Sequence, residues 1–291
     1  MTFAEKIKNA RKAAGMSQET LAEKLGVSRQ AITKWETDRG IPDIENMILI
    51  SNLFGITVDE FLSQEKETAT PKGYLYESRT EYDIDGLKRF DMRLGGARLL
   101  RVIGTDGEKI IIHLASNDIS TLEADFKVKI DDIKGRIDVE VNRKNKMTEA
   151  IAKNNLIIEV FLPNQYLAHV ELEMNCEELQ LTDIICENVE FKGKASKVFV
   201  DAMEAELELD CNVDMDIRVN DFLGALEINQ ISSTSRLTVP DNYAFQSIVK
   251  GLSNSVSFEW NGSTAEDFSN PDAENIVELN GIRSELVIAR E

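Results

Sequence analysis

Arg29, Gln30, Thr33 and Lys34 carry hydrogen-bond donors and acceptors at spacings that place all four on one side of a helix. A guanidinium can donate two hydrogen bonds to guanine, and a carboxamide can pair with adenine. A hydroxyl or an ammonium can hold phosphate oxygens. Since a helix fits the major groove of B-form DNA, the chemistry open to these four residues is the reading of base edges.

The segment that contains them, residues 17–36 (SQETLAEKLGVSRQAITKWE), has the pattern of two short helices joined by a tight turn. Ser17 and Ser28 are placed to cap the two helices, because a serine hydroxyl accepts from an amide two or three residues on. Gly26 stands where the first helix must end and a positive φ is easiest to place. The apolar residues fall on the two inner faces: Leu21, Ala22, Leu25, Ile32 and Trp35. A plain helical hairpin with a solvated basic face is the alternative interpretation.

Two longer stretches, IKNARKAAGMSQETLAEKLGVSRQAITKWE and PDIENMILISNLFGITVDEFL, carry a family resemblance. In the order and spacing of these features, residues 7–62 resemble the Cro/repressor-type (xenobiotic response element) helix-turn-helix family. The resemblance implies a five-helix DNA-binding domain. Its third helix would lie in the major groove with Arg29, Gln30, Thr33 and Lys34 toward the bases.

The resemblance also implies roles for residues beside the reading face. A basic residue at Arg11 and an acidic one at Glu36 would pair and tie the first helix to the end of the third. Gln18 would make a phosphate or base-proximal contact. We expect Gln18, Ser28 and Arg39 to hold the DNA backbone.

The remaining helices and the linker follow from caps and composition. A first helix is expected from a cap at Thr2 to about Ala14, a fourth over residues 44–54, and a short last one within residues 57–62. The polar stretch SQEKETATPKGYL has the composition of a linker. The predicted domains are residues 1–62 (helix-turn-helix), 63–75 (linker) and 76–291 (β-strand repeats).

Beyond the linker the period of the apolar residues changes to that of strands. RLLRVIGTDGEKIIIHLAS predicts a hairpin turning at residues 105–107, and FKVKIDDIKGRIDVEV a second hairpin about Gly135. LIIEVFLP has the pattern of a buried strand ended by Pro163. From Val170, short alternating segments recur every nine or ten residues. Their centres are Leu172, Leu181, Phe191, Val200, Leu209, Val219, Ile228 and residues 237–239.

A step that regular favours a solenoid of stacked strands, in which each segment buries its apolar face only against its neighbours. A β-sandwich is the alternative. The fold class expected is therefore a multidomain α plus all-β protein. On its VELEM, ELQLTD and NVEFKG units, the repeat region resembles the "putative adhesin" type of β-repeat domain of unknown function. That resemblance transfers no site residues, and we expect the region to serve dimerisation or sensing.

The charge of the chain is unevenly distributed. The formal net charge is −19 over 291 residues, but residues 1–67 hold nine basic and eleven acidic side chains, and the rest hold 24 and 41. DNA binding needs a local basic surface rather than a basic chain. Because the acidic region repels DNA, we expect modest affinity for a single copy, steep salt dependence and reliance on a dimer.

The remaining sequence features indicate a cytoplasmic protein. No apolar run approaches the 20 or so residues of a membrane span, and the N-terminus is amphipathic rather than signal-like. The odd set Cys176, Cys186 and Cys211 matches no metal-ligand spacing, so buried reduced thiols are expected.

Other candidate sites are weaker. His113 and His169 stand inside strand patterns and are expected to be satisfied beside the core. Strand carboxylates could align on stacked coils into an acidic ladder for a cation or an acid–base pair, but the simpler interpretation is a solvated face. These carboxylates are Glu171, Glu173, Glu204, Glu206, Glu208, Asp214 and Asp216. The pair Gly95 and Gly96 lacks the rest of a phosphate-cradling loop, and no serine and lysine suit a self-cleaving domain.

We therefore expect a sequence-specific transcriptional regulator, a repressor rather than an activator, that binds a double-stranded operator as a homodimer. No catalytic residue, metal or cofactor and no membrane partner are expected. The alternative hypothesis makes the β-region a binding platform for a small-molecule or protein effector, or less favourably a carbohydrate-active solenoid, with the helix-turn-helix as a tether.

Overall fold

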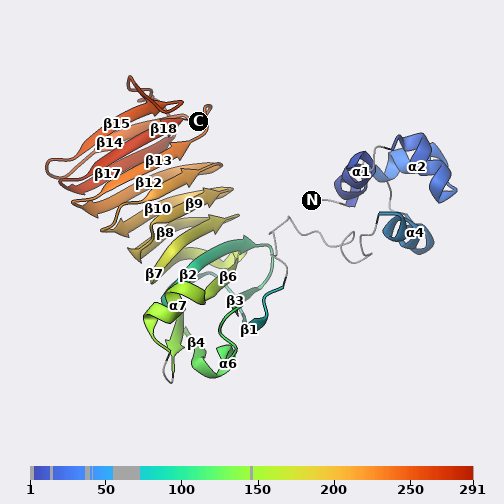
Figure 1. Cartoon of the computed structure of the whole chain (residues 1–291), viewed down its shortest axis with the longest axis horizontal. Coiled ribbons are helices and arrows are strands. Elements are labelled where there is room, and N and C mark those ends of the chain that lie inside the picture. The colour runs from blue at the N-terminus through green and yellow to red at the C-terminus, as the bar shows by residue number, and fades with distance from the viewer. Residues whose placement is uncertain are drawn as a thin grey trace. The chain divides into compact units, whose positions relative to one another are not determined.

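A computed structural model describes residues 3–13, 16–36, 40, 42–54, 73–144 and 147–290. The chain divides into two compact units, Met1–Gly73 and Tyr74–Glu291, which we call unit 1 and unit 2 (Figure 1). Each unit is described by itself. None of the described helices combines the length and the apolarity that a membrane span needs.

Unit 1 is helical. Its described helices are α1 (Phe3–Ala13), α2 (Gln18–Leu25), α3 (Arg29–Glu36) and α4 (Ile44–Phe54). The predicted inner faces form one core, because the buried cluster comprises Ile7, Leu21, Ala22, Leu25, Ile32, Trp35 and Ile50. The expected cap Thr2, the end of the first helix at Ala14, the short helix within residues 57–62 and most of the linker lie outside the described residues.

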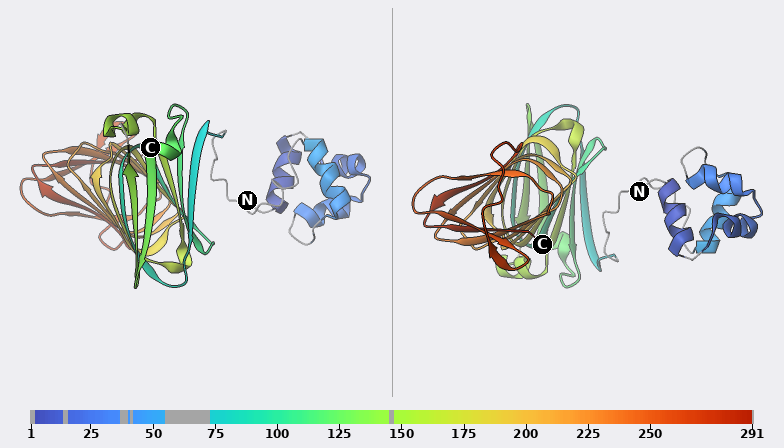
Figure 2. Two further views of the ribbon diagram at one scale, coloured as in Figure 1. Left: turned by 90° about the horizontal axis from the view of Figure 1, so that it is seen from below. Right: turned by 90° about the horizontal axis from the view of Figure 1, so that it is seen from above.

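Unit 2 consists mainly of strands. Its elements are β1 (Tyr76–Asp83), β2 (Lys88–Thr105), β3 (Lys109–Ser116), α6 (Leu122–Asp125), β4 (Phe126–Ile133), β5 (Arg136–Arg143), α7 (Glu149–Asn155), β6 (Ile157–Pro163), η1 (Asn164–Tyr166), β7 (Leu167–Thr182), β8 (Ile185–Lys194), β9 (Lys197–Asp201), β10 (Met203–Cys211), β11 (Asp216–Val219), β12 (Phe222–Ile231), β13 (Thr234–Val239), β14 (Phe245–Val249), β15 (Ser255–Trp260), β16 (Ser263–Ala265), β17 (Asn275–Ile282) and β18 (Glu285–Arg290). These strands fan out progressively from the N-terminal to the C-terminal part of the unit (Figure 2).

The strands from β7 onward pair in parallel as stacked coils. Val170 is in register with Val189, Val189 with Leu207, and Leu207 with Leu226. These offsets are two of the steps of nine or ten residues seen in the sequence. One series of neighbours, face A, runs β5–β2–β7–β8–β10–β12–β17–β14. The other, face B, runs β6–β2–β7–β9–β11–β13–β18–β15.

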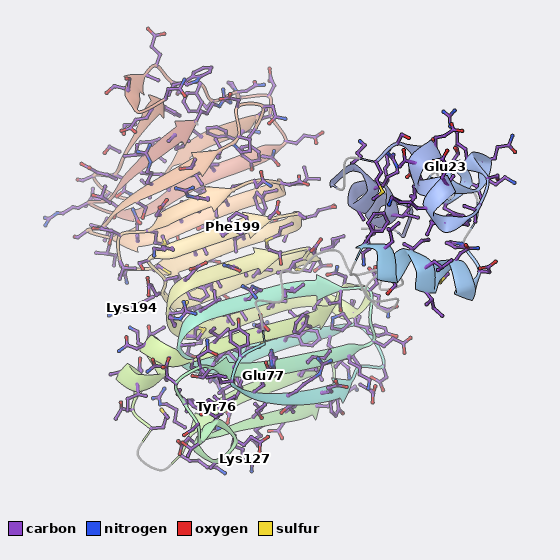
Figure 3. All side chains as sticks on the ribbon, turned by 45° about the vertical axis from the view of Figure 1, so that its right-hand side comes forward. Glu23, Tyr76, Glu77, Lys127, Lys194 and Phe199 are labelled. Carbon is purple, nitrogen blue, oxygen red and sulfur yellow. The ribbon has the colours of Figure 1, made fainter. Side chains whose placement is uncertain are left out.

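The two faces share β2 and β7, which are long enough to contribute to both. The first part of β2 pairs with β5, and its second part pairs with β6, while β7 accompanies it along both parts. Alternate side chains of each coil point inward and form one continuous core from Ile84 to Ile288. Figure 3 shows the other side chains projecting outward, among them Phe199 on β9.

The predicted hairpin at residues 105–107 is wrong. The chain turns there between β2 and β3, but β6 lies between them, because it pairs in parallel with β2 and antiparallel with β3. Nearly every residue of β6 is buried, so this strand needs a partner on each side and takes the place beside β2. The second predicted hairpin is confirmed, since β4 and β5 pair antiparallel about Gly135, whose φ is 78°.

The last coil of the stack departs from chain order. The chain first forms β14 and β15, and the later strands β17 and β18 then lie between that coil and β12–β13. The regular spacing found in the sequence ends at residues 237–239, before β14, so it gave no indication of this insertion.

Candidate nucleic-acid interface

The start of α3 is set by its turn from α2. Ser17 Oγ accepts from Thr20 N at 3.0 Å and begins α2, and Gly26 ends it in the left-handed region at φ 67°. Ser28 Oγ then accepts from Ala31 N at 3.2 Å. Both capping serines and the glycine turn therefore act as the sequence predicted, and Arg29 is the first residue of α3.

The outward face of α3 carries the four residues proposed to read bases. Arg29, Gln30, Thr33 and Lys34 are all exposed, whereas Ile32, Trp35 and Glu36 are buried. The Arg29 guanidinium lies 3.6 Å from a carboxylate oxygen of Glu19 on α2, and both side chains are about two-thirds exposed. Such a surface pair contributes roughly 0–1 kcal/mol, so a phosphate or a base could replace Glu19 at low cost. The pattern of the sequence contained no sign of this contact.

The C-terminal end of α3 is held to α1 by a buried ion pair. Arg11 Nε and Nη2 donate to the two carboxylate oxygens of Glu36 at 2.5 and 2.9 Å, and Arg11 Nη1 donates to Met16 O at 2.7 Å. Only 9% of Arg11 and 6% of Glu36 are exposed. A two-pronged pair of this kind fixes orientation as well as distance, so it sets how α3 is presented.

Gln18 completes this network from the first turn of α2. Its Nε2 donates to Glu36 at 2.8 Å, and its Oε1 lies 3.3 Å from the hydroxyl of Thr33. That hydroxyl also lies 3.1 Å from Arg29 O, and it can donate to only one of the two at a time. The structure thus brings Gln18 and Thr33 together, and it gives Gln18 an intramolecular positioning role that the sequence did not indicate.

The electrostatics of the network favour the charged forms. Burial opposes ionisation of Glu36, but the hydrogen bonds from Arg11 and Gln18 outweigh it, so the pKa of Glu36 lies below its ordinary value. The hydrogen bond to Glu36 in turn raises the pKa of Arg11. Of the three expected backbone contacts, Gln18 is half-buried, Ser28 is exposed, and Arg39 lies outside the described residues.

Unit 2 aligns carboxylates into a row, a possibility that the sequence interpretation ranked below a solvated face. Seven residues lie in register on neighbouring strands of face A: Asp138, Asp91, Glu171, Glu190, Glu208, Glu227 and Glu278. We call them the carboxylate row. Of the carboxylates singled out earlier, Glu171 and Glu208 belong to it and are half-buried, while the other five are exposed.

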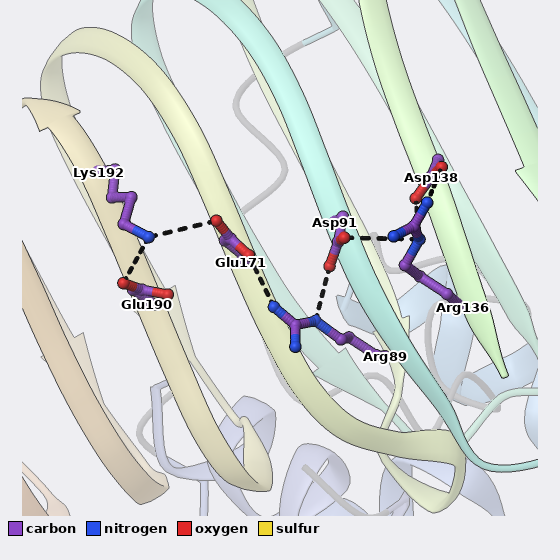
Figure 4. Close-up of polar contacts among 7 residues, drawn as sticks. All are labelled: Arg89, Asp91, Arg136, Asp138, Glu171, Glu190 and Lys192. Atoms are coloured by element: carbon purple, nitrogen blue, oxygen red, sulfur yellow. Dashed lines mark hydrogen bonds and ion pairs between the residues drawn. The ribbon is translucent and has the colours of Figure 1, made fainter.

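Basic side chains interleave with the row at both ends, and Figure 4 shows the end that begins at Asp138. Arg136 pairs with Asp138 at 2.7 Å, and Arg89 lies 2.9 Å from both Asp91 and Glu171. Lys250 pairs with Glu278 at the far end at 2.8 Å. Among the described residues, no basic group lies within ion-pair distance of Glu208 or Glu227 in the middle.

Three side chains at the row have the composition of a metal site. The ligand atoms of His169, Glu171 and Glu190 lie within 4.8 Å of one another. Lys192 Nζ, however, lies 2.7 Å from Glu190 and 3.3 Å from Glu171. An ammonium therefore already occupies the position that a cation would take.

The other histidine and the cysteines are satisfied or buried. His113 Nδ1 lies 2.8 Å from Glu159, and this hydrogen bond raises the pKa of His113. All three cysteines are free, and burial raises the pKa of Cys176 and Cys211 to about 12 and that of Cys186 to about 11. Thiols with such values are protonated and unreactive at neutral pH.

Comparison with known proteins places unit 1 among helix-turn-helix domains. Residues 7–61 match the helix-turn-helix family HTH_3. The HTH-type transcriptional activator BcrR of Enterococcus faecalis is 47% identical over 66 residues, which are 23% of this chain and 32% of that protein. The SPbeta prophage-derived HTH-type transcriptional regulator YonR of Bacillus subtilis is 35% identical over 60 residues, 21% of this chain and 56% of that one. The phage repressor RstR of Vibrio cholerae is 33% identical over 60 residues, 21% and 54% of the two chains. The chain thus spans 32–56% of the length of these relatives.

The C-terminal part has solved structures as its neighbours. A crystal structure described as a putative adhesin from Bacteroides fragilis is 9% identical with a TM-score of 0.40, over 75% of this chain and 98% of that one. A putative cell adhesion protein from Clostridium sporogenes is 12% identical with a TM-score of 0.36, over 74% of this chain and 100% of that one.

Proposed function

We propose that this protein is a sequence-specific DNA-binding transcriptional regulator that inserts α3 into the major groove. The observation that carries the proposal is the division of α3 into two faces. Arg29, Gln30, Thr33 and Lys34 are exposed on one side, and the other side is anchored in the core. The match of residues 7–61 to the helix-turn-helix family supports it.

The network behind α3 supports the same proposal on physical grounds. Arg11, Gln18 and Glu36 tie α1 and the first turn of α2 to the last residue of α3. Base recognition needs side chains held close to their productive geometry, and a helix fastened on its buried side meets that need. Gln18, Ser28 and Arg39 are proposed to hold the phosphate backbone.

We further propose that the protein acts as a homodimer and represses by occupying an operator. The helix-turn-helix domains of the two subunits would meet half-sites about one helical turn apart. Residues 68–291 hold 24 basic and 41 acidic side chains and so repel DNA. This repulsion supports the need for two DNA-binding domains, because a single domain would have to bind against it alone. Unit 2 would supply the dimer contact, an effector site, or both.

Selection of bound sequences from random DNA with the full chain tests the proposal. The expected result is an enriched pseudo-palindrome whose half-sites are centred about 10 base pairs apart or a multiple of that spacing. An enriched single half-site would contradict the dimer but keep the DNA-binding function. The absence of any enriched sequence at low salt would overturn the function itself.

A further inference from the structure

A cavity of about 260 Å³ lies where β2 and β7 pass from face A to face B. Its lining includes Gly95 and Gly193, which are both in register with Met174 between them. A Cβ at Gly95 would come within 3.0 Å of Arg143 Nη1, so the missing side chain leaves the guanidinium its place. Of the glycine pair that the sequence could not connect to any phosphate loop, Gly95 lines this cavity.

Three cations from three strands line this cavity. They are Arg93 on β2, Arg143 at the end of β5 and Lys192 on β8. Two carboxylates, Glu149 and Glu173, also line it, so the lining residues are basic by three to two, and the charge of Lys192 is shared with Glu190 and Glu171 of the carboxylate row. A basic lining stands out within residues 68–291, where acidic side chains outnumber basic ones by 41 to 24.

The two arginines of the cavity are loosely paired. Arg93 lies 3.6 Å from Glu173 and 3.9 Å from Glu140, and Arg143 lies 3.7 Å from Glu149. Charge-assisted hydrogen bonds are normally about 2.7–2.9 Å long. On the same face, Arg89 and Arg136 reach that range, with carboxylate contacts of 2.9 and 2.7 Å (Figure 4).

Because these ion pairs are long, the N–H groups of Arg93 and Arg143 remain available as hydrogen-bond donors. Within the part of the chain that the structure describes, neither guanidinium at the cavity makes a hydrogen bond to its neighbouring carboxylates. Arg93 is 71% exposed and the carboxylate of Glu173 is 66% exposed, so water screens this pair. A guanidinium presents its N–H groups in a fixed fork that matches the oxygens of a phosphate or a carboxylate.

We propose that this cavity binds a small multivalent oxyanion, a metabolite that carries phosphate or several carboxylates. Its oxygens would accept from Arg93 and Arg143, while Lys192, which is already paired with Glu190 and Glu171, would contribute only at longer range. Bound there, the anion would link β5, β2 and β8 across the bend between the two faces. The proposal concerns unit 2 alone and stands whether or not unit 1 binds DNA.

Titration of the full chain with inorganic phosphate, pyrophosphate and citrate tests the inference, by calorimetry and by thermal shift at constant ionic strength set with chloride. Saturable binding of at least one probe is expected. Preference for the phosphates or for citrate distinguishes the two sources of oxyanion. If none of the three probes saturates, the proposal is overturned.

Variants locate the binding. Arg143→Ala should weaken it at least tenfold, with folding checked by circular dichroism. Arg98→Ala, an exposed arginine on the same strand as Arg93 but outside the lining, should leave it unchanged. Glu149→Gln removes the carboxylate that competes for Arg143 and should tighten binding several-fold. That gain cannot arise from damage to the fold. Unchanged affinity in Arg143→Ala, or weaker affinity in Glu149→Gln, would refute the site.

Discussion

Arg29 is the side chain on which base discrimination should depend most, because it opens α3 and its guanidinium can make two hydrogen bonds to guanine. Arg29→Ala is expected to cost roughly 1–3 kcal/mol of binding free energy and to relax one base position. Arg29→Lys is the matched control, since it keeps the charge but loses the fork. Mobility-shift titrations on the selected operator and on single-base variants measure both. Full discrimination in Arg29→Ala would remove this residue from the interface.

Glu36 is buried with Arg11, so the pair should make unit 1 sensitive to acid. Its folded-state pKa is lowered, so the stability it supplies is complete above the ordinary value of 4.5 and is lost as the pH falls below that value. Glu36→Gln leaves Arg11 buried without its counter-charge, which should cost about 3–5 kcal/mol at neutral pH. Unfolding followed by circular dichroism from pH 7 to pH 3 should show that this difference narrows in acid. A constant difference would contradict the assignment.

Glu208 lies in the middle of the carboxylate row, and its pKa is shifted in the opposite direction to that of Glu36. Burial, and then the nearby charges of Glu190, Glu227 and Asp210, raise its pKa. Its charged form therefore opposes folding, and the stability available below the unfolded-state pKa is lost as the pH rises through the folded-state pKa.

Glu208→Gln should consequently raise the melting temperature of unit 2 at pH 7, by the equivalent of roughly 0.2–1 kcal/mol for each like-charged neighbour. The gain should vanish near pH 4. Glu206→Gln is the control on the same strand, because its in-register neighbours Asn188 and Ala225 carry no charge. Equal effects of the two substitutions in calorimetry would exclude repulsion along the row.

Among the elements, the coils of unit 2 depend on a close backbone approach at their bend. Gly193 has a φ of 143°, and a Cβ there would lie 1.9 Å from Met174 O of the coil below. Gly193→Ala is therefore expected to destabilise unit 2 by on the order of 3 kcal/mol. Gly86→Ala, where a Cβ meets nothing within 4 Å, should change stability by at most about 0.5 kcal/mol. Chemical denaturation of both variants decides the point.

The protein as a whole combines a near-neutral helical unit with a strongly acidic β-unit. Because repulsion by residues 68–291 must be offset by phosphate contacts, operator affinity should fall steeply with salt. If a dimer neutralises about six phosphates, log K against log salt has a slope of roughly −5. Fluorescence anisotropy of the full chain between 50 and 300 mM salt, as chosen conditions, measures it. A slope near zero would contradict the binding of unit 1 to DNA phosphates.

Local features of the chain were readable without coordinates because they depend on neighbours within about four residues or on a period of two. Helices α2 and α3 begin at their caps Ser17 and Ser28 and α2 ends at Gly26, as predicted, and the alternating apolar and polar residues on both sides of Gly135 form a hairpin. The stack step also followed from the regular spacing. Each of these features is determined by local backbone conformation and by the burial of one face of an element. Both of these factors depend on residues that are close together in the chain.

Partnership between distant segments was decided by packing, which no local pattern encodes. Three features depend on which pairs of strands bury the most apolar surface against each other. They are the position of β6 beside β2, the position of the coil β17–β18 within the stack, and the carboxylate row. The same holds for the double use of Gln18 and for the basic cavity above Gly95, whose cations come from three separate strands. Pairing free energy is summed over contacts between residues far apart in the chain, and so it emerges only when the coils close on one another.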